Sequence, residues 1–168
     1  MAYNIRPVEE KDLKFLLEIR QDPEVRDNLG TFAMLTMKDQ KGWYERLEED
    51  ESRRYFIFEN EDEEIGYVRM MQIDYINRSV CVGGDIHDKC RGKGHSTGMY
   101  DLILDLCFNK LNMNRVWLFV LEDNLRARHI YTNKGFILEG AQRKAIYKGG
   151  KYQDYMMMSM LRGEYGKL

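Results

Sequence analysis

The residues best suited to do chemistry lie in a glycine-rich stretch, Arg91-Gly-Lys-Gly-His-Ser-Thr-Gly98, between a predicted strand and a predicted helix. Glycine tolerates positive φ and lets backbone N–H groups approach an anion closely. The start of the following helix adds unpaired N–H groups and the positive end of its dipole. This combination is typical of a diphosphate cradle, to which Arg91 or Lys93 adds charge. A plain glycine turn is the alternative for the loop taken alone.

Two other classes of nucleotide-binding loop do not fit the spacing. A Walker loop has Gly-Lys followed directly by Ser or Thr, whereas Lys93 is followed by Gly94. A Rossmann loop has three closely spaced glycines early in the chain and an acidic residue on the next strand. Gly92, Gly94 and Gly98 are spaced differently, and they lie halfway along the chain. Neither class explains this loop.

A second group of residues lies on the next predicted helix. Helical spacing puts Asn124, Ala127 and Tyr131 on one face. A tyrosine hydroxyl on such a face can donate a proton to a group within hydrogen-bond reach, although a core tyrosine with a backbone partner fits the same pattern. Asn124 is also suited to cap the helix N-terminus.

Together the two groups resemble the acyl-CoA N-acyltransferases of the GNAT superfamily. Arg91-x-x-Gly94-x-Ser96 resembles the acetyl-CoA signature Arg/Gln-x-x-Gly-x-Gly/Ala, with a serine still small enough for close backbone approach. The segment from Asn124 to Phe136 is similar to the family's second block, Asn-x-x-Ala-x-x-x-Tyr-x-Lys-x-Gly-Phe, with one residue fewer before Gly-Phe. The tail from Glu139 to Leu161 resembles the branch of ribosomal-protein, polyamine and nucleotide-amino-sugar acetyltransferases.

The resemblance implies acetyl-CoA as co-substrate and direct attack by an amine in a ternary complex. It implies that amides of the glycine-rich loop hold the diphosphate, that the strand end pairs with the pantetheine arm, and that Tyr131 protonates the thiolate. The residues expected to contact coenzyme A are Ile86, His87, Arg91, Gly92, Lys93, Gly94, His95, Ser96, Thr97, Asn124, Ala127 and Lys134. The His95 side chain itself is expected to be packed or to face solvent.

The sequence does not identify the group that removes the proton of the attacking amine. Relatives often place a glutamate ten residues before the cradle arginine, but Cys81 stands there and is interpreted as a buried filler. Asp85 is our candidate catalytic carboxylate. His87, near it in the sequence, is another candidate base, and Glu45 and Glu139 are more distant candidates. A water chain, or an amine of low pKa that needs no base, are the alternatives.

A backbone N–H near Ile86 is expected to stabilise the oxyanion. Gly83-Gly84 is expected to form the bulge that splays this strand.

The predicted acceptor is a small primary amine of the amino-sugar, polyamine or aminoglycoside type. Acceptor specificity is expected from residues 22–35, from the helix with Trp43 and Tyr44, and from the closing hairpin. A protein N-terminus or lysine is the rival acceptor, and a non-catalytic acyl-CoA-binding module is the rival of another class.

Hydrophobic periodicity predicts an α/β (α+β) fold with a mixed, mostly antiparallel sheet, in the order βα-α-βββ-α-β-α-ββ. The predicted strands are 3–6, 54–59, 65–71, 78–86, 115–120, 136–147 and 152–161, and the predicted helices are 9–20, one from Thr36, one ending near Lys110, and 124–134. The stretch between the first two helices is expected to be irregular up to Leu35, with Asp22-Pro23 ending the first helix.

Composition indicates one domain spanning residues 1–168. The 43% hydrophobic and 32% charged residues are enough for a core, and the net charge of −2, without a basic stripe, argues against nucleic acid. No apolar run is long enough to span a membrane. The three cysteines lack metal-ligand spacing and indicate reduced thiols in the cytoplasm, with no metal cofactor. A homodimer is possible, since dimers are common in the family that the chain resembles.

Overall fold

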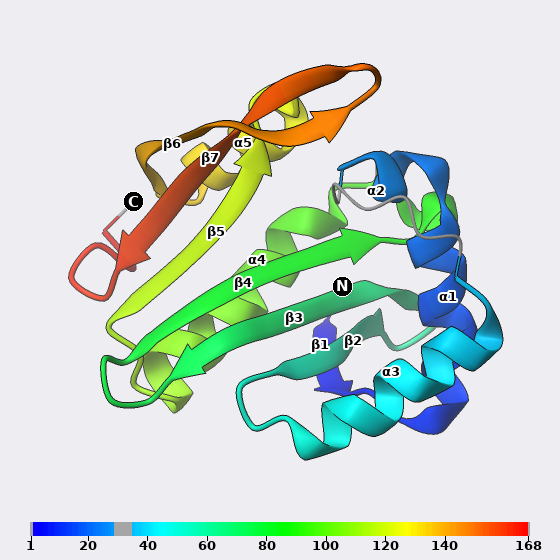
Figure 1. Ribbon diagram of the computed structural model, residues 1–168. Coiled ribbons are helices and arrows are strands. Elements are labelled where there is room, and N and C mark those ends of the chain that lie inside the picture. Colours follow the sequence, from blue (N-terminus) through cyan, green and yellow to red (C-terminus); the bar gives the residue numbers. More distant parts are fainter. Residues whose placement is uncertain (1, 29–34, 168) are drawn as a thin grey trace.

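The computed structural model describes residues 2–28 and 35–167. The strands of this part form one seven-stranded sheet in the order β1-β2-β3-β4-β5-β7-β6 (Figure 1). The strands are β1 (Tyr3–Pro7), β2 (Arg54–Asn60), β3 (Glu64–Asp74), β4 (Ser79–Ile86), β5 (Arg115–Leu121), β6 (Ile137–Lys148) and β7 (Lys151–Leu161). All neighbouring strands are antiparallel except β4 and β5. The predicted mostly antiparallel sheet is confirmed.

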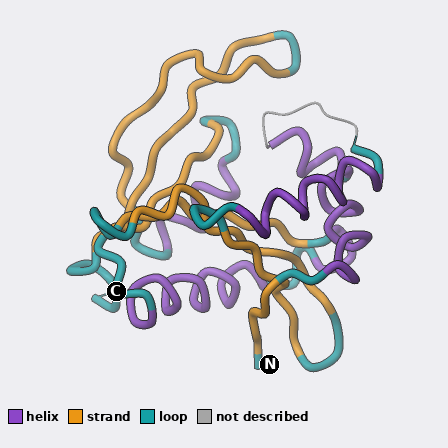
Figure 2. Tube along the Cα trace, turned by 60° about the horizontal axis from the view of Figure 1, so that its bottom comes forward, coloured by secondary structure: helices purple, strands orange, loops and turns teal. Residues whose placement is uncertain are grey.

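Helices cover both faces of this sheet (Figures 1 and 2). They are α1 (Leu13–Gln21), α2 (Pro23–Asn28), α3 (Met37–Glu49), α4 (His95–Asp105) and α5 (Leu125–Asn133), with short helical turns η1 (Glu10–Asp12), η2 (Asp88–Cys90) and the π-helical η3 (Leu106–Lys110). Most boundaries agree with the sequence prediction within a few residues.

The expectation of an irregular segment after Asp22 is wrong for α2. The Asp22 carboxylate accepts hydrogen bonds from the amides of Glu24 and Val25 and so caps a new helix. Proline is well tolerated in the first turn of a helix, where its missing N–H costs nothing. Residues 29–34, the middle of the expected acceptor loop, lie outside the described residues.

The two faces of the sheet bury separate cores. On β2, Phe58 and its neighbour Ile57 are both fully buried but point to opposite faces, as strand alternation requires. Phe58 packs with α4 and η3 residues, and Ile57 packs with residues of α1 and α2. Trp43 of α3, one of the residues expected to determine acceptor specificity, packs edge-on against Tyr55 with ring centroids 4.8 Å apart.

The strands β4 and β5 pair over only part of their length. Their parallel register comprises three pairs, Ser79–Arg115, Val80–Val116 and Cys81–Trp117. Beyond these, β5 stays paired with β7, while β4 stays paired with β3 (Figure 1). A gap therefore opens in the sheet, and the β4 edge from Val82 to Ile86 faces it.

The expected bulge at Gly83-Gly84 is wrong. The register of β4 with β3 runs without interruption from Gly66–Ile86 to Met71–Cys81. The splay arises from the divergence of β5 and not from an extra residue in β4.

The closing hairpin is tied to the sheet by Glu139 of β6. Its carboxylate forms a two-pronged ion pair with Arg115 of β5 and accepts a 2.7 Å hydrogen bond from Ser159 of β7. Hydrogen bonds from Arg115 and Ser159 lower the pKa of Glu139 from 4.5 to about 2. A carboxyl whose pKa is depressed by folding stabilises the folded state above its unfolded pKa. That contribution disappears as the pH falls through the folded pKa.

We expect Glu139→Gln to lower the free energy of unfolding at pH 7, because Arg115 loses its counter-charge. The difference from wild type should shrink between pH 4.5 and about 2, where wild-type Glu139 itself becomes protonated. Urea unfolding across this range measures it, with Glu61→Gln in the exposed β2–β3 turn as control. A difference that stays constant with pH would contradict this role.

Candidate active site

The glycine-rich loop leads directly into α4. Gly92 and Gly94 have φ of +78° and +83°, which glycine adopts without strain, and Gly94 is the N-cap of α4. Among the described residues, apart from the chain neighbours of each glycine, no heavy atom lies within 4 Å of where a Cβ of either glycine would stand. The loop therefore presents open space beside a helix start, as an anion cradle requires.

His95 and Gly98 anchor this helix start to β1. The His95 side chain is buried, and its Nδ1 lies 2.9 Å from the Tyr3 hydroxyl, which confirms a packed histidine. Gly98 lies inside α4 and not in the loop, where a Cβ would come within 2.4 Å of the Tyr3 ring.

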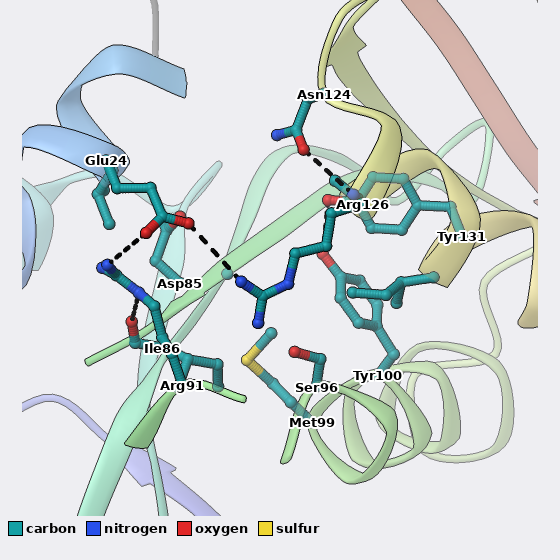
Figure 3. Close-up of a pocket in the computed structure, with 14 residues that line it drawn as sticks. Glu24, Asp85, Ile86, Arg91, Ser96, Met99, Tyr100, Asn124, Arg126 and Tyr131 are labelled. Carbon is teal, nitrogen blue, oxygen red and sulfur yellow. Dashed lines mark hydrogen bonds and ion pairs between the residues drawn. The ribbon is translucent and has the colours of Figure 1, made fainter. Parts of the chain in front are cut away.

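Arg91 is directed toward α2. Its Nη1 lies 3.0 Å from Glu24 and 3.2 Å from Asp22, and its Nε donates to the Ile86 carbonyl. Figure 3 shows Glu24 lying between Arg91 and Arg126 of α5, with 3.7 Å to the latter. Arg91 thus joins the loop to α2, and Lys93 is exposed.

Two adjoining cavities form an elongated slot along α5. The first, of about 140 Å³, lies between the β4 edge and α5 (Figure 3). The second, of about 290 Å³, extends over the glycine-rich loop. Predicted site residues lining the first are Asp85, Ile86, Arg91, Ser96, Asn124, Ala127 and Tyr131, and those lining the second include Gly92, Gly94, His95 and Thr97.

Tyr131 lies at the β4 end of the slot, beside Tyr100 of α4 (Figure 3). The Tyr100 hydroxyl donates to the Tyr131 hydroxyl over 3.1 Å, and the rings meet edge to face. Burial raises the pKa of both phenols, so both keep their protons near neutral pH. Because Tyr100 supplies the donor in this bond, the Tyr131 hydrogen is left for another partner.

Asp85 takes part in a compact polar cluster with Arg69 and Tyr67 of β3. Asp85 Oδ2 lies 2.9 Å from Arg69 Nη1 and accepts from the Tyr67 hydroxyl at 2.8 Å. The same Nη1 lies 3.1 Å from the Tyr67 oxygen. The Arg69 side chain is 16% exposed and the Asp85 side chain is 18% exposed, so this ion pair is largely shielded from water.

The glycines of β4 make room for this cluster. A Cβ on Gly83 would stand 2.9 Å from Arg69 Nη2, and one on Gly84 would stand 2.8 Å from the Tyr67 carbonyl oxygen. Gly83 therefore lets the guanidinium lie across the strand.

A third cavity, of about 70 Å³, passes through the gap between β4 and β5. It shares Gly84, Asp85, Asn124 and Tyr131 with the slot, and it reaches Arg69, Phe119 and Tyr155. Phe119 and Tyr155 stack with ring centroids 4.7 Å apart. We call this cavity the passage. Asp85 and Tyr131 line both it and the slot, so a group in the slot can meet a second molecule in the passage.

Residues 3–137 match the family described as acetyltransferase (GNAT) domain. The chain belongs to this family.

Two relatives extend the match over nearly the whole chain. The spermidine N(1)-acetyltransferase of Escherichia coli K12 is 26% identical over 98% of this chain and 88% of its own length. The structure of the spermidine N-acetyltransferase of Vibrio cholerae, in complex with CoA and spermine, superposes with a TM-score of 0.93 at 27% identity, covering 97% of each chain. Another structure of that enzyme is dodecameric. The chain is accordingly an acetyl-CoA-dependent N-acetyltransferase that acts on a small amine.

Three predicted cofactor contacts of this GNAT acetyltransferase, His87, Lys93 and Lys134, line neither part of the slot. The buried His87 ring stacks on Phe15 and has Asp88 at 2.7 Å. Lys134 forms an ion pair with Asp101 of α4, at the end of α5 opposite Asn124. His87 and Lys134 hold elements together here and are not part of our proposal.

Cys81 is buried, and burial raises the pKa of its thiol to about 11. A neutral thiol does not accept a proton near pH 7, in agreement with its interpretation as a filler.

Some residues reach the site only through the fold. Arg69 gave no signal in the sequence, because a polar residue between the apolar Val68 and Met70 is the ordinary alternation of a strand. Tyr100 and Arg126 had no distinguishing pattern.

In residues 2–28 and 35–167, no cluster of three or more His, Cys, Asp or Glu side chains is arranged to hold a metal ion. Nor does any helix within that part have the length and apolar character needed to cross a membrane.

We expect Asp85→Asn to lower the free energy of unfolding by about 3 kcal/mol, because it leaves the Arg69 charge shielded from water without its counter-charge. Asp62→Asn, in the exposed β2–β3 turn, is the control and should change stability by less than about 0.5 kcal/mol. Urea unfolding at pH 7 measures both. Equal, small effects of the two variants would show that the Asp85–Arg69 pair is not a structural ion pair.

Proposed function

We propose that this acetyltransferase binds acetyl-CoA in the slot and a small primary amine in the passage, and that acetyl transfer takes place where the two meet. The observation that carries the proposal is the shared lining of the two cavities by Asp85 and Tyr131. The gap between β4 and β5 supplies the opening through which an amine on one face of the sheet reaches a thioester on the other.

The chain offers a complete set of groups for the cofactor. The Gly92 to Thr97 amides and the start of α4 would hold the diphosphate, with Arg126 nearby. The unpaired edge of β4 would bind the pantetheine amides as an added strand would. Asn124 Oδ1 accepts from the Ala127 amide and caps α5, so its Nδ2 is the group left to bind the arm.

Incoming phosphates compete with Glu24. Glu24 lies between Arg91 and Arg126, and a phosphate there would take over part of these contacts. The Arg91 contact with Asp22 would remain.

In the reaction, the amine nitrogen attacks the thioester carbonyl and the carbon–sulfur bond breaks. A backbone N–H at the β4 edge near Ile86 would stabilise the oxyanion. Tyr131 would then give its proton to the leaving sulfur, since Tyr100 already donates to the Tyr131 oxygen. Tyr131 would regain a proton from water, which balances the proton that water takes from the amine.

Asp85 is proposed to hold the incoming amine. In the described part of the chain, its contacts with Arg69 and Tyr67 are both made by Oδ2, which leaves Oδ1 for an N–H of the acceptor. A proton resting on Asp85 would remove the counter-charge of Arg69. We therefore propose that water, and not Asp85, finally takes the amine proton.

The acceptor classes for a first screen are polyamines, amino sugars linked to nucleotides, and aminoglycosides. Polyamines are included in the screen because the two relatives described above are spermidine acetyltransferases. Acetylation of a protein N-terminus or lysine is the runner-up, which labelling of a protein extract by acetyl-CoA would favour if every small amine failed. Cytoplasmic location and a homodimer stay predictions, and the dodecameric relative supports self-association.

We expect Tyr131→Phe to lower kcat by more than about tenfold, because the leaving thiolate loses its proton donor. The dissociation constant for acetyl-CoA should change little, since the ring still fills its place. Release of free thiol with an amine panel gives kcat, and calorimetry gives the affinity. Tyr75→Phe in the exposed turn between β3 and β4 is the matched control, and unchanged turnover in Tyr131→Phe would rule out the proton-donor role.

A further inference from the structure

We propose that Arg69 binds an acidic group of the acceptor, so that the substrate is an amine carrying a carboxylate or phosphate close to the reacting nitrogen. This inference rests on the proposed function, because it assigns the acceptor to the passage. Among the acceptor classes of the screen, it favours amines that carry an acidic group over amines that do not.

The first observation is the geometry of the Arg69 guanidinium. Among the described residues, its contacts with Asp85 and Tyr67 are all made by Nη1. Nη2 and Nε lie against Gly83 at the strand edge, and Arg69 and Gly83 both line the passage. The Nε–Nη2 side of a guanidinium presents two parallel N–H donors, which match two oxygens of a carboxylate or phosphate.

The second observation is the charge of the site. The charged side chains lining the slot and the passage in the described part are two carboxylates and three guanidiniums, namely Glu24, Asp85, Arg69, Arg91 and Arg126. In the passage itself, the positive charge of Arg69 and the negative charge of Asp85 cancel. A substrate with several ammonium groups needs an excess of carboxylates, because each buried charge requires a partner, and this lining does not provide it.

The third observation is the order of the groups. Asp85 also lines the slot, whereas Arg69 lines only the passage. An ammonium on Asp85 would therefore lie near the thioester, and an acidic group on Arg69 would lie just behind it. Since the two residues are themselves in contact, the amine and the acid of the acceptor must be only a few bonds apart. The stacked Phe119 and Tyr155 would border the rest of the molecule.

The test compares amines that differ only in the acidic group. Putrescine is paired with ornithine, and ethanolamine with O-phosphoethanolamine; thiol release from acetyl-CoA gives kcat/KM for each. The wild-type enzyme should prefer the acidic member of at least one pair by about tenfold or more, the effect of one charge-assisted contact. The ornithine pair reports a carboxylate, and the ethanolamine pair reports a phosphate.

Variants then connect the preference to Arg69. In Arg69→Gln/Asp85→Asn, which leaves no unpaired charge, the preference for the acidic member should disappear, mainly through its KM. Arg69→Lys should keep the preference at reduced size, because a charge remains without the two-pronged geometry. Calorimetry with acetyl-CoA should show nearly unchanged affinity in both variants, which confirms an intact slot.

The outcomes separate the two claims. Wild-type turnover that favours the acid-free member of both pairs, or that equals it, overturns the inference while the proposed function stands. A preference for acidic amines that survives in the double variant also overturns the role of Arg69. Absence of turnover with every amine overturns the proposed function and this inference together.

Discussion

The site depends on the separation of the parallel strands β4 and β5 after three residue pairs. After Cys81 and Trp117, β5 follows β7 and β4 follows β3, because each strand keeps its antiparallel partner. Backbone groups on the open edge of β4 are then without a strand partner, and buried backbone donors are costly unless they are paired. A ligand with amides along its length can supply the missing hydrogen bonds. The coenzyme A arm has this character. In the proposed function, the same divergence creates both the edge that binds this arm and the opening through which the amine arrives.

Other features of the chain fit around that gap. Glycines at positions 83 and 84 let Arg69 and the Tyr67 carbonyl approach the strand, and the α4 start places the anion cradle next to its end. Tyr131 and Asp85 approach the gap from opposite walls, one from α5 and one from β4. Each is held by a neighbour of its own, Tyr100 in one case and Arg69 in the other. The chemistry thus depends on side chains from strands and helices far apart in the sequence.

Local patterns predicted the parts of the site that are local. The glycine-rich loop, the Asn124 cap and the helical face with Tyr131 are each set by a few adjacent residues, and all three lie where expected. The long-range parts were not predictable in the same way. Arg91 was expected at the diphosphate because of its position in the motif, but its ion pairs with Asp22 and Glu24 are long-range contacts that the motif does not encode. The splay was assigned to a glycine bulge, whereas it follows from strand order, which no short segment encodes. Arg69 and Arg126 became site residues only after the sheet and α5 were assembled.

Amide hydrogen exchange with and without acetyl-CoA tests the central claim most directly. Saturating acetyl-CoA should slow exchange along β4 from Val82 to Ile86 and in the loop from Gly92 to Thr97, while β6 exchanges as before. This result would place the coenzyme arm on the open strand edge. If acetyl-CoA bound the folded protein but left these two segments unchanged, the coenzyme would lie elsewhere, and the account of the gap would be wrong.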